Sequence, residues 1–278
     1  MPIPSTNENL LVTFLVKPLV FIVKIPFLVV STLGLILLSP IGQLCKPLLY
    51  LYLAVFFNLS QTELLVDGVK KSNQSTINSK RPNKGDIIFV NFSSPLDSLV
   101  LYISCRCSSA VFYTINEQGQ LAKVGSPLNC FKFALQQTHQ SSVSHSLKVT
   151  DHSRAIFVLV EGTTTNNRSV MRFPKKFDIN KFVETNTNDH RFKALSIKIH
   201  PTDLACTPLP ESWFTFVYNN VSNFRLDLRY RMKLFEMDRK TEITEQSIRE
   251  SLSNYGKLKL LGEYLDIAKK KEFVQSYS

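Results

Sequence analysis

The sequence predicts an α/β domain: a mixed, mostly parallel sheet with flanking helices, preceded by an N-terminal membrane helical hairpin and followed by a short helical tail. Two apolar runs, residues 87–90 and 155–160, have the length and β-branched content of strands buried on both faces. Each is followed directly by a loop that is rich in polar residues. In open α/β sheets, loops at the carboxyl ends of strands are where ligands bind. Residues 10–59, in contrast, have membrane composition. We therefore expect a ligand site where the two strands end, in a domain held at a membrane.

The apolar N-terminal segment allows more than one topology. Its only charges are Lys17, Lys24 and Lys46, and residues 25–45 carry none, so the run is long enough to cross about 30 Å of hydrocarbon. Prolines and glycines interrupt it, however, and the second apolar block, residues 48–59, is too short to cross alone. These breaks favour a re-entrant or tilted hairpin over one true span. A hairpin buried in the core of a soluble protein is the third alternative, whereas the length of the run argues against a cleaved signal peptide.

A formal net charge of +11, with 44% hydrophobic residues, indicates an anionic partner, either a nucleic acid or the acidic face of a membrane. The apolar N-terminus favours the membrane. A nucleic-acid partner has no support beyond charge, because the basic residues around position 230 alternate with core residues. The five cysteines are scattered without Cys-x-x-Cys spacing, so we expect neither a disulfide framework nor a zinc site, and a domain that faces the reducing cytosol.

Three parts are expected along the chain: a membrane anchor at residues 1–60, an α/β domain at 61–238 and a helical tail at 239–278. Polar residues 61–86 predict a linker that includes a short strand, and further strands are expected at 110–115, 193–200 and 223–234. The last of these has one apolar and one basic face, which is typical of an edge strand. In the tail, Thr244 and Glu245 open a helix that turns Ile248 and Leu252 inward, and one or two short amphipathic helices follow at 258–278.

The first polar loop follows the strand at residues 87–90. It contains Asn91, Ser94 and Asp97, and Asp97 opens a run, residues 98–103, that is expected to be helical. A carboxylate beside a bound substrate can accept or orient a proton. Asp97 is therefore the acid–base candidate of this loop.

The second polar loop follows the strand at residues 155–160 and begins with Glu161 and Gly162. Its hydroxyls, amides and guanidinium are groups that suit an anion, above all a phosphate. The alternative is an ordinary solvated turn. The residues that carry these groups are Thr163, Thr164, Thr165, Asn166, Asn167 and Arg168.

Taken together, the two loops resemble the motifs of the glycerolipid acyltransferase family, membrane enzymes that acylate glycerol 3-phosphate and lysophospholipids. Asn91, Ser94 and Asp97 match the family's Asn-His-x-Ser-x-x-Asp motif, and residues 161–163 match its Phe-x-Glu-Gly-Thr motif. More narrowly, the first loop is similar to that of the fungal lipid-droplet lysophosphatidic acid:oleoyl-CoA acyltransferases. The resemblance covers roughly residues 60–240, and only the two motifs are specific.

The resemblance implies an acyl-CoA-dependent lysophospholipid O-acyltransferase, of the EC 2.3.1 type, whose favoured acceptor is lysophosphatidic acid. Acyl-CoA would be a co-substrate, and neither a bound cofactor nor a metal is expected. The enzyme would lie at the endoplasmic reticulum membrane or the lipid droplet surface, and both loops would line one pocket that opens toward lipid. The residues implied in catalysis are Asp97, Ser94 and Asn91, and those implied in substrate binding are Glu161, Gly162, Thr163, Thr164, Thr165, Asn166, Arg168, Arg172 and Lys175.

Two features depart from the family pattern. Phe92 stands where the family has the histidine that takes the proton from the acceptor hydroxyl, which a phenylalanine cannot do. The family's second motif, Gly-x-x-Phe-Ile-x-Arg, is not found. The base would then be Asp97, water or a distant histidine, although His139, His145 and His152 lie in a serine-rich stretch typical of solvated loops. A second interpretation stays open: a non-catalytic member of the fold that binds phospholipid or acyl-CoA.

Overall fold

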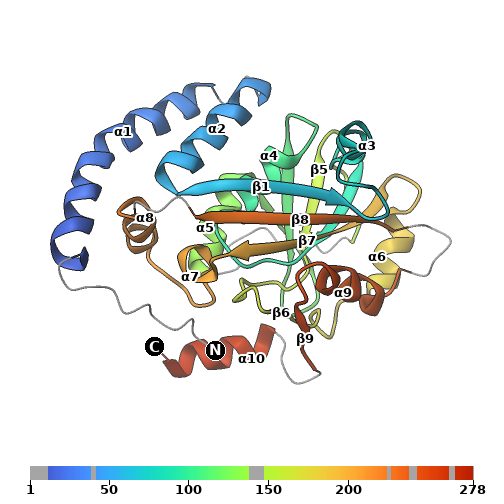
Figure 1. The fold of residues 1–278 in the computed structure, drawn as a ribbon. Coiled ribbons are helices and arrows are strands. Elements are labelled where there is room, and N and C mark those ends of the chain that lie inside the picture. The colour runs from blue at the N-terminus through green and yellow to red at the C-terminus, as the bar shows by residue number, and fades with distance from the viewer. Residues whose placement is uncertain are drawn as a thin grey trace.

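Helices cover both faces of one central sheet in the computed structural model, which describes residues 12–38, 42–137, 147–223, 227–237, 243–262 and 267–277 (Figure 1). Within these residues, seven strands form the sheet in the order β1-β8-β7-β2-β5-β3-β4. Neighbouring strands run parallel except in the pairs β7/β8 and β3/β4. The predicted mixed, mostly parallel sheet with flanking helices is confirmed. The strands are β1 (Leu59–Val66), β2 (Asp86–Val90), β3 (Ala110–Ile115), β4 (Leu121–Gly125), β5 (Ala155–Leu159), β7 (Arg191–His200) and β8 (Leu228–Glu236).

An apolar cluster lies on each face of the sheet. Ile88 and Val90 of β2 point into one cluster, and Ile87 and Phe89 point into the other. Because side chains alternate along a strand, a strand covered on both faces needs an unbroken apolar run, and this is the pattern of β2 and β5. The helices that pack on the first cluster include α4 (Asp97–Ser104), α5 (Pro127–Gln136), α7 (Thr202–Ala205) and α8 (Trp213–Val221); those on the second include α6 (Ile179–Asn186) and α9 (Glu245–Asn254).

The N-terminal apolar segment is a helical hairpin, α1 (Lys17–Leu38) and α2 (Gly42–Phe56), with a π-helical turn, η1 (Val12–Val16), before it. Residues 12–38 are long and apolar enough to cross a membrane, and 0% of their apolar window is buried. Placement of α1 in a soluble core is therefore wrong. The second helix, α2, instead packs on the domain through Leu53 and Phe56.

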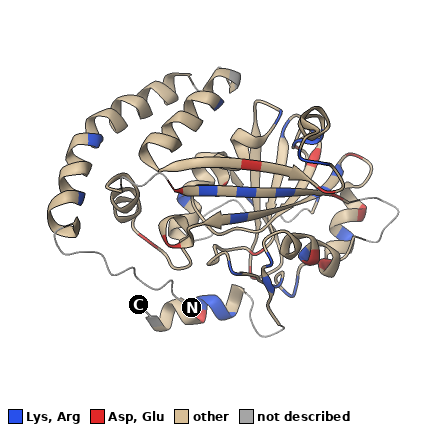
Figure 2. Cartoon of the chain, in the orientation of Figure 1, with Lys and Arg blue, Asp and Glu red and all other residues tan. Residues whose placement is uncertain are grey.

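Two sequence expectations about secondary structure are wrong. The short strand expected within residues 61–86 is present, as most of β1, but the rest is not a linker, because it contains the helix α3 (Gln74–Lys80), which is anchored by the fully buried Ile77. The basic strand β8 is not an edge strand, because it lies between β1 and β7. Its Arg229 and Arg231 remain exposed nonetheless. Figure 2 shows basic residues repeated along this strand. The alternation of apolar and polar residues shows which face of a strand is exposed to solvent, but it does not show which other strands lie beside that strand. Residues 224–226, the expected start of this strand, lie outside the described residues.

The C-terminal region returns to the sheet. Thr244 and Ser247 exchange side-chain and backbone hydrogen bonds in a capping box, and α9 then turns Ile248 and Leu252 inward, which confirms the predicted helix. After α9 comes a two-residue strand, β9 (Lys259–Leu260), paired with β6 (Ser169–Val170). A single described helix, α10 (Ile267–Tyr277), completes this region.

Candidate active site

The two polar loops lie side by side because the strands before them are neighbours. β2 and β5 pair in parallel, and Val90 is in register with Leu159. Both strands therefore end at the same edge of the sheet, one step before the loops that begin at Asn91 and Glu161. Backbone and side chain join the loops further: Thr165 N donates to Phe92 O at 2.8 Å, and the Thr165 and Ser93 hydroxyls lie 3.1 Å apart.

Glu161 is the main connection between the loops. Its Oε2 accepts from Phe92 N at 2.7 Å and its Oε1 accepts from Met171 N at 2.9 Å. The side chain is fully buried, and this burial raises the pKa of Glu161 to about 8, although the two backbone donors and Lys270 favour the charged form. Glu161 thus holds the first loop in place through a backbone N–H that any residue at position 92 would supply.

Asp97 lies at the start of α4 and organises the first loop. Its Oδ2 accepts from Ser93 N at 2.8 Å and from Ser94 N at 2.9 Å, whereas its Oδ1 has no hydrogen bond among the described residues. Burial raises the pKa of Asp97 to about 7, against the opposing effect of the two backbone donors and of the Tyr230 hydroxyl. That hydroxyl is close enough to affect the carboxylate but does not meet it at hydrogen-bonding geometry. Oδ1 is therefore the oxygen of this buried carboxylate that does not help to fix the first loop.

The Phe92 ring lies in the apolar core. It is 0% exposed and stacks on Phe133 with ring centroids 6.3 Å apart. The histidines of the described chain do not replace the missing imidazole: His152 and His190 stack at the opposite edge, before β5 and β7, and His200 is exposed. His139 and His145 lie outside the described residues. Among the described residues, no histidine forms a hydrogen bond with Asp97 or Glu161.

The predicted amides and hydroxyls serve mainly to fix the loops. Asn91 bridges to β7, because its Nδ2 donates to Ile197 O at 3.0 Å and its Oδ1 accepts from Ile197 N at 2.7 Å. The Ser94 hydroxyl accepts from Leu96 N at 3.1 Å. The Asn167 side chain donates to the Ser93 hydroxyl at 3.1 Å. These groups keep the strand ends together where the sheet stops.

Gly162 cannot be replaced without a rearrangement. Its φ of 67° is in the left-handed region, and a Cβ there would lie 2.4 Å from Ile115 O. The same Cβ would lie 2.7 Å from Cδ1 of Ile267, on α10. The glycine of the motif therefore allows α10 to approach the second loop closely.

The predicted cations do not enter the buried cluster. Arg168 and Lys175 are exposed, and Asn166 is half-buried and uses its Oδ1 to accept from Arg168 N. Arg172 is half-buried, near Arg249 of α9. Among the described residues, no group of three His, Cys, Asp or Glu side chains could hold a metal ion.

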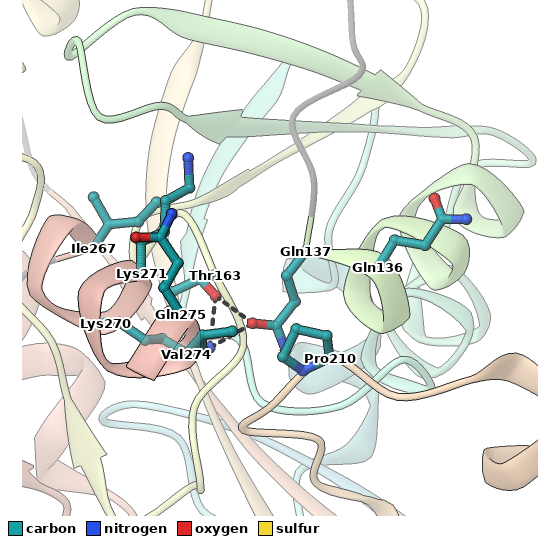
Figure 3. Close-up of a pocket in the computed structure, with 9 residues that line it drawn as sticks. All are labelled: Gln136, Gln137, Thr163, Pro210, Ile267, Lys270, Lys271, Val274 and Gln275. Atoms are coloured by element: carbon teal, nitrogen blue, oxygen red, sulfur yellow. Dashed lines mark hydrogen bonds between the residues drawn. The ribbon is translucent and has the colours of Figure 1, made fainter. Parts of the chain in front are cut away.

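Lys270, Gln137 and Thr207 are parts of the site that the sequence analysis missed. Lys270 Nζ donates to the Thr163 hydroxyl at 2.7 Å, to Thr164 O at 2.5 Å and to Gln137 Oε1 at 2.8 Å (Figure 3). The Gln137 amide in turn donates to Thr207 O at 3.0 Å. Lys270 lies three residues after Ile267 and four before Val274, a helical spacing that places all three on one face of α10 and could have identified it.

The site is closed over its carboxylates. Asp97 is 1% exposed and Glu161 is 0% exposed. The segment at Thr207 covers both loops: Thr207 N donates to Ser93 O, and Thr207 O accepts from the Thr164 hydroxyl. A cavity of about 230 Å³ does lie at this edge, but its lining includes Thr163 and neither carboxylate. The two motifs therefore meet as expected, whereas the expected pocket open to lipid at the carboxylates is absent from the described residues.

Comparisons with known proteins agree with the two motifs. No family model matches the chain. The chain is 29% identical, over 275 residues, to a Schizosaccharomyces pombe protein named "Putative lysophosphatidic acid:oleoyl-CoA acyltransferase", and the match covers 91% of this chain and 87% of that protein. A match of this extent includes both polar loops, so the resemblance to such acyltransferases is confirmed over most of the chain.

A solved structure also aligns with the chain. It is the 1-acyl-sn-glycerophosphate (LPA) acyltransferase PlsC from Thermotoga maritima, which is 15% identical and covered at 95% in both chains, with a TM-score of 0.34.

Proposed function

We propose that the protein transfers a fatty acyl group from acyl-CoA to a lysophospholipid at a membrane surface, with lysophosphatidic acid as the favoured acceptor. The observation that carries the proposal is the 29% identical S. pombe relative, whose name states this acceptor and this donor and whose match includes both motifs. The contact between Glu161 and Phe92 N supports it, because it joins the two motifs into one unit around Asp97.

Direct attack of the acceptor hydroxyl on the thioester is the mechanism that this site favours. The hydroxyl oxygen forms an ester bond to the acyl carbon while the carbon–sulfur bond breaks, and the thiolate of CoA leaves. Asp97 Oδ1, which has no hydrogen bond among the described residues, takes the hydroxyl proton and returns it to the thiolate. Because burial raises the pKa of Asp97 to about 7, the carboxylate can both accept and release this proton near neutral pH.

The membrane would be reached through α1 and the domain surface next to it. Most apolar side chains of α1 are exposed, whereas Phe21 on this helix is buried and packs edge-to-face on Phe214 of α8 with ring centroids 5.9 Å apart. Trp213 and Phe214 remain 66% and 53% exposed. Aromatic side chains of this kind are common where protein meets the membrane interface. We propose the endoplasmic reticulum membrane or the lipid droplet surface as the location, with the domain on the cytosolic side.

The second candidate function is lipid or acyl-CoA binding without catalysis. Two observations favour it: the core position of the Phe92 ring and the burial of both carboxylates. Catalysis requires that the segment at Thr207 moves to expose Asp97, whereas binding alone does not.

Acyl transfer by membranes that contain the protein distinguishes the two. Labelled oleoyl-CoA is supplied with lysophosphatidic acid, lysophosphatidylcholine or glycerol 3-phosphate, to wild type, Asp97→Asn and the control Asp189→Asn, an exposed acid near the opposite edge of the sheet. We expect transfer to lysophosphatidic acid by wild type and the control, and a loss of about 100-fold or more in Asp97→Asn. Undiminished transfer in Asp97→Asn would contradict the assignment of Asp97, and inactive wild type would favour the binding function.

A further inference from the structure

Lys270 is half-buried and brings a cationic side chain to the second loop from a helix more than a hundred residues later in the chain. Its three contacts are a hydroxyl, a backbone carbonyl and an amide oxygen, and all three are neutral. Among the described residues it forms no ion pair, whereas its neighbours Lys269 and Lys271 pair with Glu272 and Glu117. A buried cation is usually matched by an anion, because neutral oxygens replace only part of its hydration.

Glu161 is the nearest candidate for that anion, but it does not fulfil the role. It forms no ion pair with Lys270 within the described part of the chain, and burial raises the pKa of Glu161 to about 8, so it is largely uncharged at neutral pH. Burial likewise lowers the pKa of Lys270 to about 7, with Glu161 as the opposing influence. The ammonium is thus destabilised where it stands, and an anion beside it would restore its charge.

A cavity for such an anion lies beside Lys270. It measures about 230 Å³, well above the volume needed to hold one water. Most of its lining surface is apolar, and its polar groups gather at Lys270, Thr163 and Gln137, between α10 and the end of α5 (Figure 3). Beside Lys270, the polar lining consists of Thr163, Gln136, Gln137, Lys271 and Gln275.

We propose that this cavity binds the phosphate group of a substrate of the acyl transfer, and that Lys270 is its charged ligand. The proposal rests on the function proposed above. A phosphate oxygen would take the place of the Gln137 amide oxygen on Nζ, exchanging a neutral acceptor for an anionic one, which makes the stronger hydrogen bond. Lys270 would then supply a cation in a chain that has no arginine between Arg106 and Arg154 and whose Arg168 is exposed.

Two substrates carry phosphate, the lysolipid headgroup and CoA, so the kinetic test measures each separately. Lys270→Gln removes the charge but keeps hydrogen-bonding ability, Lys270→Arg keeps the charge, and Lys269→Gln is a matched control on the exposed side of α10. Apparent KM values are measured for lysophosphatidic acid and for oleoyl-CoA, and then for two phosphate-free partners, monoacylglycerol and oleoyl-N-acetylcysteamine.

In Lys270→Gln we expect the KM of one phosphate-bearing substrate to rise about 10- to 100-fold, as for loss of a hydrogen bond to a charged group. A rise for lysophosphatidic acid identifies the headgroup, and a rise for oleoyl-CoA identifies the nucleotide. Lys270→Arg should recover much of the loss, and the phosphate-free partners should change little. The proposal is overturned when neither KM differs from that of Lys269→Gln, or when phosphate-free substrates suffer equally. Lys270→Met replaces Lys270→Gln if thermal unfolding shows that the latter is not folded.

An inactive wild type would overturn the proposed function and leave this site to be tested alone. Equilibrium binding of labelled lysophosphatidic acid and of monoacylglycerol is then compared in detergent. A preference for the phosphate-bearing lipid in wild type that disappears in Lys270→Gln supports the site. An equal preference in both proteins overturns it.

Discussion

Glu161 shows how one buried side chain can join two loops through their backbone N–H groups. Its two carboxylate oxygens bind Phe92 N and Met171 N, so it fixes the first loop and the segment beyond the second. The cost is a carboxyl group in a fully buried position. Because burial raises its pKa to about 8, well above the ordinary 4.5, the folded protein takes up a proton there that the unfolded chain releases.

The stability of the wild type should therefore fall as pH rises from 5 to 8. The contribution of protonated Glu161 to the free energy of unfolding is complete below pH about 4.5. It is lost as pH rises through 8, at roughly 1 kcal/mol per pH unit. Asp97, with a pKa raised to about 7, acts in the same direction, whereas Lys270 acts in the opposite direction, above pH about 7. Glu161→Gln should flatten the dependence on pH. Urea unfolding in detergent at pH 5.5 and 7.5 measures it, with the exposed Glu184→Gln as control; equal slopes in all three proteins would contradict the burial argument.

The sequence could predict the residues of the two loops but not most of what surrounds them. Asn91, Asp97 and Glu161 stand in local patterns at strand ends, and local patterns are visible in one sequence. Lys270 and Thr207 reach the loops only through tertiary folding. The spacing of Ile267, Lys270 and Val274 shows which member of the basic run 269–271 shares a helix face with apolar residues, but not which part of the molecule that face contacts.

At the scale of elements, α1 and α8 form one apolar surface. Phe21 of α1 contacts both Phe214 and Tyr218 of α8, and Lys24 Nζ donates to Asn223 O at 3.0 Å just after that helix. This arrangement places Trp213 next to the helix that has the length and composition of a membrane segment. We infer that α8 enters the membrane interface together with α1.

Trp213 can report this directly because it is the only tryptophan in the chain. On reconstitution into vesicles, its emission should shift to shorter wavelength, and brominated acyl chains should quench it, since the indole leaves water for the lipid interface. Trp213→Phe provides the blank. Unshifted and unquenched emission from protein that sediments with the vesicles would show that α8 stays in water.

The sequence predicted the positions of the strands better than it predicted which strands pair with one another. Apolar runs located β2, β3 and β5 because strands covered on both faces leave that pattern. The position of β8 inside the sheet and the helix α3 were missed, since half-buried strands and short polar helices leave weaker patterns. The order of the strands in the sheet is set by contacts between segments that are distant in the sequence, so no local pattern shows it.

At the scale of the whole molecule, we propose that the two loops, which are more than sixty residues apart in the sequence, act as one catalytic unit. The sheet order explains how they meet, since β2 and β5 are adjacent and parallel. The segment at Thr207 and α10 then cover the unit. Catalysis by this unit therefore requires both an intact pair of loops and a movement that exposes Asp97 to the acceptor.

A double-mutant cycle on acyl transfer tests this claim most directly. The value of kcat/KM for oleoyl transfer to lysophosphatidic acid is measured for wild type, Asp97→Asn, Glu161→Gln and the double variant, with thermal unfolding to verify that each is folded. Parts of one unit are not additive, so the double variant should be about as slow as the slower single variant, with a coupling energy of about 1 kcal/mol or more. Losses that multiply, as for two independent sites, would contradict the account.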